Sequence, residues 1–178
     1  MTLTEIRLAL SGEPPLGKAK RSELLLLVSA QALDRASRPD GGLAGVPGGS
    51  EVILLVEDEA PIRALVRTIL EIKGYAVCEA RNGREGLELC GAHEGPIHML
   101  LSDVNMPDLG GRELADGVLR LRPGMRVMFM SGYAENVPLD DGARNGAAFL
   151  QKPFTPSALA LKVRETLDYR ARSAGQGD

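Results

Sequence analysis

From residue 51 onward, short apolar runs alternate with segments in which apolar residues recur every three or four positions. The runs have the length of buried strands, and the intervening segments have the periodicity of helices. The predicted strands are 52–56, 75–80, 99–103, 126–130 and 147–151. Strands and helices alternating at intervals of roughly 25 residues require right-handed crossovers, which predicts a doubly wound α/β domain with helices on both faces of a parallel sheet.

Helix boundaries follow from residues that start or stop a helix. Pro61 suits a first turn and Gly74 a stop, while Asn82 can cap a second helix. A third helix is expected around Leu114, and Thr155 with the proline after it opens a last one. The polar segment 132–146 predicts only a short or irregular helix.

Composition divides the chain of 178 residues into three regions. Residues 1–50 are predicted to be an N-terminal extension with a helix at 22–37 and a flexible Gly/Pro linker at 38–50. Residues 51–170 are the α/β domain, and residues 171–178 a disordered tail. One ordinary core is expected for this length.

Within the extension, Gly12, Gly17 and Lys18 stand at the glycine and lysine positions of a phosphate-binding P-loop. Ala19, however, occupies the position at which a hydroxyl must ligate Mg²⁺, and two adjacent prolines beginning at Pro14 remove amides that would cradle phosphate. A P-loop is therefore rejected.

Composition excludes several classes of function. The net charge of -3 and the small aromatic content, three Phe and three Tyr with no Trp, argue against a nucleic-acid surface. The longest apolar run, 24–28, is far shorter than the roughly 18 residues of a membrane span. Without a signal peptide, Cys78 and Cys90 are expected to be reduced thiols in the cytoplasm. We expect His93 and His98 to be structural.

Polar residues gather at the ends of four of the five predicted strands. Glu57 and Asp58 follow the first strand, Asp103 ends the third, Ser131 follows the fourth, and Lys152 follows the fifth. Because ligands bind outside the carboxyl ends of parallel strands, these side chains are expected to form one site.

Three carboxylates at this edge would repel one another by several kcal/mol per pair at roughly 4 to 6 Å and an effective dielectric constant of about 20. A divalent cation would offset that repulsion, and an all-oxygen donor set favours Mg²⁺, with Mn²⁺ as the alternative. Lys152 can pair with Asp103 or with a phosphoryl oxygen. An ionised aspartate can attack phosphorus without a general base, which makes Asp103 a candidate phosphoacceptor.

Four motifs, VEDE at 56–59, SDVNMP at 102–107, MSGY at 130–133 and FLQKPF at 149–154, resemble the response-regulator receiver domain of two-component signalling. The resemblance covers about residues 51–170. It implies a flavodoxin-like fold, with five parallel strands in the order 2-1-3-4-5.

The resemblance also implies a role for each acidic residue. Asp103 would be phosphorylated, Asp58 would ligate Mg²⁺ directly, and Glu57 would act mainly through water. Asn105 would offer its backbone carbonyl to the metal. Glu57 stands where the family most often has Asp, so direct ligation by this longer side chain is in doubt.

Three further positions match the conformational switch of the family. Ser131 and Lys152 would contact the phosphoryl group, and the peptide bond before Pro153 would be cis. Phe149 falls at the aromatic switch position without a tyrosine hydroxyl, so its coupling to Ser131 must use ring packing. The weak helix after Tyr133 puts in doubt the usual output face of fourth helix, fifth strand and fifth helix.

By this resemblance the chain accepts a phosphoryl group from a phosphohistidine of a sensor histidine kinase or histidine phosphotransfer protein. It would catalyse only its own phosphorylation and slow dephosphorylation. No ATP-binding glycine motif appears, so it is not expected to phosphorylate itself from ATP. With no effector domain after the last helix, the output is expected to be contact with an unidentified protein or onward phosphotransfer. A homodimer is left open.

Three alternatives stay open. The stretch PGGSEVILLVEDE at 47–59 resembles the junction before the receiver of a hybrid sensor histidine kinase, so the chain can be a relay or phosphate sink from such a protein. A haloacid dehalogenase phosphatase also uses a strand-end Asp with Mg²⁺, but generally needs a second Asp where this chain has Asn105. The third alternative is an adaptor that works without phosphorylation.

Overall fold

The computed structural model describes residue 43, residues 45–132 and residues 146–169. The helix predicted at 22–37, most of the polar segment 132–146 and the tail predicted at 171–178 lie outside the described residues. From β1 (Val52–Val56) to β4 (Arg126–Ser131) the described strands and helices alternate as the sequence predicts, and a helix follows β5 (Ala148–Gln151).

Five strands form one sheet in the order β2-β1-β3-β4-β5, and every neighbouring pair is parallel. This confirms the predicted fold. The described elements are β1 (Val52–Val56), α3 (Ala60–Ile72), β2 (Ala76–Ala80), α4 (Gly83–Ala92), β3 (Met99–Asp103), α5 (Gly111–Leu121), β4 (Arg126–Ser131), β5 (Ala148–Gln151) and α7 (Pro156–Asp168).

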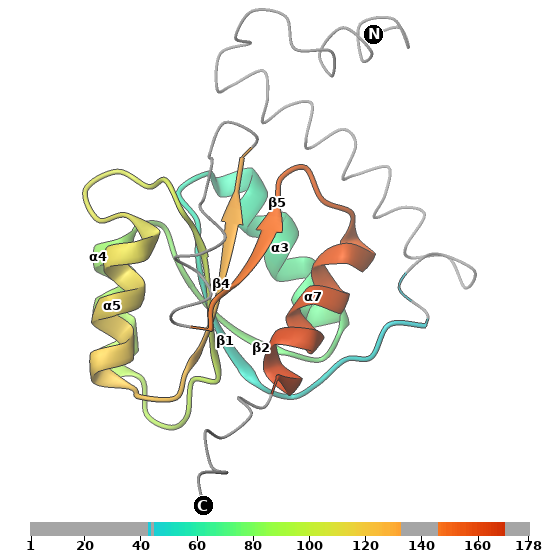
Figure 1. Ribbon diagram of the computed structural model, residues 1–178, viewed down its shortest axis with the longest axis horizontal. Coiled ribbons are helices and arrows are strands. Elements are labelled where there is room, and N and C mark those ends of the chain that lie inside the picture. The colour runs from blue at the N-terminus through green and yellow to red at the C-terminus, as the bar shows by residue number, and fades with distance from the viewer. Residues whose placement is uncertain (1–42, 44, 133–145, 170–178) are drawn as a thin grey trace, which may run out of the picture.

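Helices cover both faces of the sheet. Figure 1 shows α4 and α5 on one side and α3 and α7 on the other. Along β1, Ile53 and Leu55 pack into the core beneath α3 and α7, whereas Leu54 and Val56 pack into the core beneath α4 and α5. Because both faces are buried, the strand is apolar at successive positions instead of alternating with polar residues.

The helix signals read from the sequence are present in the structure. Asn82 caps α4 by accepting a hydrogen bond from the Glu85 amide at 2.9 Å. Thr155 caps α7 in the same way, with the Ala158 amide at 3.1 Å. Gly74, just beyond α3, has a φ of 90°, a left-handed conformation that favours glycine.

The segment before β1 lies against the domain in the part that is described. Leu43 is only 4% exposed and packs into the core beneath α3 and α7. Lys73 Nζ donates to the Leu43 carbonyl at 3.0 Å, and the Gly49 amide donates to the Lys73 carbonyl at 3.0 Å. The sequence predicts a flexible linker over 38–50. A single leucine in a Gly/Pro-rich stretch does not reveal that its side chain joins the core.

Among the residues that the structure describes, no helix is long and apolar enough to cross a bilayer.

Candidate functional site

The parallel register brings the carboxyl ends of the central strands to one edge of the sheet. Val56 pairs with Ser102, Asp103 with Met130, and Ser131 with Gln151. At this edge Glu57, Asp58 and Asp103 each offer a carboxylate oxygen, and the three atoms lie within 4.8 Å of one another. The three acidic side chains that the sequence analysis singled out therefore share one site.

Lys152 lies between two of these carboxylates. Its Nζ is 2.8 Å from Glu57 Oε2 and 3.0 Å from Asp103 Oδ2. The side chains of Lys152, Glu57 and Asp103 are 9%, 0% and 11% exposed, so both ion pairs are shielded from water. The Lys152 amide also donates to the Ser131 carbonyl at 2.7 Å, which continues the pairing of β4 with β5 as far as the lysine.

Burial and charge act in opposite directions on the two central groups. Burial raises the pKa of Glu57 to about 7, the Lys152 cation opposes that rise, and the Asp103 carboxylate adds to it. Burial alone would lower the pKa of Lys152, but Glu57 and Asp103 outweigh it and hold that pKa above its ordinary value. Lys152 is therefore a cation at neutral pH, available to an anionic group in the site.

The two oxygens of Glu57 already have hydrogen-bond partners. Oε1 accepts from the Glu59 amide at 3.2 Å, and Oε2 accepts from Lys152. Asp58 is half-buried, while the Asp103 contact with Lys152 involves Oδ2. Asp58 and Asp103 are thus better placed to offer an oxygen to an incoming cation, and Glu57 is better placed to hold the lysine.

Backbone hydrogen bonds hold the loop after β3 against the end of the sheet. The Val104 amide donates to the Met130 carbonyl at 3.1 Å, and the Gly111 amide donates to the Val104 carbonyl at 3.0 Å. A Cβ on Gly111 would collide with the Asp103 carbonyl oxygen. Glycine at the start of α5 therefore lets this helix approach the end of β3 closely.

The predicted switch residues lie in β4 and β5 or directly after β5. Ser131 is the last residue of β4 and is buried, and the peptide bond between Lys152 and Pro153 is cis. Phe149 is half-buried opposite Phe129, with ring centroids 5.3 Å apart and ring planes inclined by 36°. The switch roles of Ser131 and Phe149, like the carbonyl role of the exposed Asn105, stay predictions.

One residue of this edge was missed by the sequence analysis. Arg63, the fourth residue of α3, turns back onto the loop that carries the acid pair. Its Nη1 donates to the Glu57 carbonyl at 2.7 Å and lies 3.5 Å from the Asp58 carbonyl. The available signal was a basic residue in the first turns of a helix that directly follows three acidic residues.

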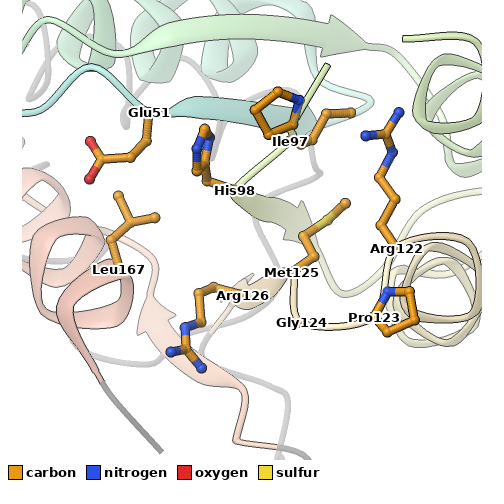
Figure 2. Close-up of a pocket in the computed structure, with 10 residues that line it drawn as sticks. Glu51, Ile97, His98, Arg122, Pro123, Gly124, Met125, Arg126 and Leu167 are labelled. Atoms are coloured by element: carbon orange, nitrogen blue, oxygen red, sulfur yellow. The ribbon is translucent and has the colours of Figure 1, made fainter. Parts of the chain in front are cut away.

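A pocket of about 440 Å³ lies at the opposite end of the sheet, where β3 and β4 begin (Figure 2). Here His98 Nδ1 accepts from the Val52 amide at 2.9 Å, consistent with the structural role expected for this histidine. Arg122 donates to three backbone carbonyls at and beyond the end of α4, and Glu51 pairs with Arg164 at 2.8 Å. These polar groups link loops and helices, and the acidic cluster lies at the other edge.

The geometry and the motifs agree with a known family. The family model of the response regulator receiver domain matches residues 53–164. The chain belongs to this family. It is a receiver domain of the two-component type, as the motifs predicted.

Two curated relatives illustrate how such receivers occur. The chain is 39% identical over 125 residues to the sensor kinase CckA of Brucella abortus (strain 2308), an alignment that covers 67% of this chain but only 13% of the relative. It is 35% identical over 117 residues to the response regulator receiver protein CpdR of the same strain, covering 65% of this chain and 95% of that protein.

Solved structures of receivers are similar as well. A receiver domain protein from Methanospirillum hungatei JF-1 has a TM-score of 0.61 and 34% identity, covering 67% of this chain and 95% of that chain. The receiver domain from the hybrid histidine kinase CckA has a TM-score of 0.56 and 34% identity, covering 65% of this chain and 98% of that chain.

Proposed function

We propose that this receiver domain accepts a phosphoryl group on Asp103 from the phosphohistidine of a sensor histidine kinase or a histidine phosphotransfer protein. The observation that carries the proposal is the position of the Asp103 carboxylate, 3.0 Å from the buried Lys152 cation and beside two further acidic side chains. A carboxylate in this setting is both a nucleophile and one part of a cation-binding cluster.

The donor set fits a hard divalent cation. Its side-chain ligands are carboxylate oxygens, which suit Mg²⁺ and Mn²⁺, and within the described part of the chain no Cys or His belongs to the cluster. In this proposal Asp58 and Asp103 would hold the ion together with the Asn105 carbonyl, while Glu57 would act mainly through water. When bound, the ion supplies positive charge to the phosphoryl oxygens.

Each residue then has a defined part in the transfer. A carboxylate oxygen of Asp103 attacks phosphorus, a P–O bond forms, the P–N bond to the donor imidazole breaks, and the neutral histidine leaves after taking up a proton. Lys152 pairs with a phosphoryl oxygen in place of the Asp103 oxygen it now contacts. The Ser131 hydroxyl donates a hydrogen bond to the arriving group, which draws Ser131 inward, and Phe149 adjusts by ring packing.

Incubation with Mg²⁺ and acetyl phosphate or phosphoramidate, followed by intact-protein mass spectrometry, tests the proposal. We expect a gain of one phosphoryl group that depends on Mg²⁺ and is lost in Asp103→Asn. Absence of the gain contradicts the proposal. Rapid turnover of generic phosphomonoesters would instead favour a phosphatase of the haloacid dehalogenase type, despite Asn105 at the position of its acid/base.

The second candidate is a relay or phosphate sink in a hybrid sensor histidine kinase, favoured by the 39% identity to the sensor kinase CckA. A relay must pass its phosphoryl group back to a histidine. Purified phosphorylated protein, mixed with an unphosphorylated histidine phosphotransfer protein, should then lose its phosphoryl group to that partner. A stand-alone switch would keep it and would bind an output protein in the phosphorylated form.

A further inference from the structure

Arg63 makes contacts that the stability of its own helix does not explain. A helix has partial positive charge at its N-terminus, so a cation in the first turns is unfavourable by a few tenths of a kcal/mol to about 1 kcal/mol. The first turn of α3 contains no acidic residue, and the side chain of its N-cap, Glu59, makes no capping hydrogen bond. With respect to the dipole of its own helix, the arginine therefore stands at the unfavourable end.

The loop in front of the helix supplies the compensation. Arg63 Nη1 donates to the Glu57 carbonyl at 2.7 Å and approaches the Asp58 carbonyl at 3.5 Å. A hydrogen bond from a guanidinium is stronger than one between neutral groups. The two carbonyls belong to the residues that begin the acidic cluster.

This contact fixes the peptide groups from which the acidic side chains project. The Glu57 amide donates to the Ala80 carbonyl at 3.2 Å, so the backbone is held on one side by β2 and on the other by Arg63. Rotation of the peptide between Glu57 and Asp58 would swing the Asp58 side chain away from Asp103. A displacement of about 1 Å is enough to cost a reaction orders of magnitude.

We propose that Arg63 is a positioning residue of the phosphoacceptor site, which holds the Glu57 and Asp58 carbonyls so that the Asp58 carboxylate faces Asp103. This inference rests on the proposed function, because it gives Arg63 a role in cation binding at that site. Arg63 touches neither the phosphoryl group nor the cation in this scheme.

Charge and positioning predict effects of opposite sign on Mg²⁺ affinity. Removing a cation close to a cation site should tighten Mg²⁺ binding if Arg63 acts only through its charge. Removing a group that orients a ligand should weaken Mg²⁺ binding, typically by about tenfold or more. The direction of the change in Kd thus separates the two roles.

The experiment measures the Mg²⁺ Kd of the full chain by titration calorimetry, with thermal unfolding in EDTA recorded for each variant. We expect Arg63→Gln to raise the Kd by about tenfold and Arg63→Lys, which keeps the charge but has a shorter reach, to raise it by a smaller factor. The control is Arg67→Gln, which removes a half-buried guanidinium one turn further along α3, where it pairs with Glu79 at 3.3 Å. This control should stay within about twofold of wild type.

An unchanged or lowered Kd in folded Arg63→Gln overturns the inference, and so does a loss of thermal stability without a change in Kd. If Arg63→Gln does not fold, an unchanged Kd in Arg63→Lys overturns it. If the wild-type chain takes up a phosphoryl group and binds Mg²⁺, and the variants bind Mg²⁺ equally well, only the role of Arg63 is refuted. If the wild-type chain neither takes up a phosphoryl group nor binds Mg²⁺, the proposed function is refuted as well.

Discussion

Replacing Lys152 by methionine tests the electrostatic balance of the site most directly. Methionine has a similar length and keeps the apolar part of the side chain, but it removes the cation that contacts Glu57 at 2.8 Å and Asp103 at 3.0 Å. The two acidic side chains remain nearly inaccessible to water, at 0% and 11% exposed. The substitution therefore leaves buried negative charge without its partner.

The expected cost follows from the burial of the pair. Removing one partner of a fully buried ion pair destabilises a protein by about 3–5 kcal/mol. Glu57 limits this cost, because burial already raises its pKa to about 7 and it can take up a proton when the lysine is gone. We expect the free energy of unfolding to fall by about 3 kcal/mol in EDTA at neutral pH.

Urea unfolding followed by far-UV circular dichroism measures this change. The matched control is Lys162→Met in α7, since Lys162 is 39% exposed and its pair with Glu165 at 3.3 Å lies on the surface. The control should change the free energy of unfolding by about 0.5 kcal/mol or less. Saturating Mg²⁺ should recover more stability in Lys152→Met than it adds to wild type, because the divalent cation replaces the lost charge.

A loss below about 1 kcal/mol, or one equal to that of Lys162→Met, would refute this reasoning. It would mean that the attraction between Lys152 and the two carboxylates is little larger than the free energy needed to desolvate these groups. Equal stabilisation of both proteins by Mg²⁺ would show that the lysine and the metal act on different charges.

Three further substitutions probe individual residues. Gly111→Ala should lower the free energy of unfolding by about 1–3 kcal/mol because its Cβ meets a backbone carbonyl, whereas Gly91→Ala in α4 meets nothing within 4 Å and should be neutral or stabilising in the same urea assay. Arg122→Ala should lower the free energy of unfolding by about 2–3 kcal/mol, because three carbonyls lose a charged hydrogen-bond donor. Differential scanning calorimetry measures this loss. The bond to Arg164 lowers the pKa of Glu51, so its stabilisation is present above the ordinary value of 4.5 and is lost as pH falls. Glu51→Gln should therefore cost about 1 kcal/mol or less at neutral pH and nothing in acid, as urea unfolding at both pH values will show.

Much of the fold could be predicted because the pattern of apolar residues within each strand agrees with the rule that governs connections between strands. An apolar run such as Val52–Val56 is continuous only where both faces of a strand are buried, and alternation with helices then requires parallel strands. Parallel strands deliver their carboxyl ends to one edge, so the approach of Glu57, Asp58 and Asp103 followed from topology alone.

The sequence by itself thus determined the sheet, the edge at which polar residues gather and the family. Tertiary structure alone decided the partners: Lys152 contacts Glu57 across 95 positions of sequence, Arg63 turns back onto backbone carbonyls, and Leu43 enters the core. The physical reason is one of precision. Strand order and periodicity tell which strand end carries a residue, whereas a hydrogen bond depends on atomic positions to tenths of an ångström. Those distances arise only when all the packed layers are in place.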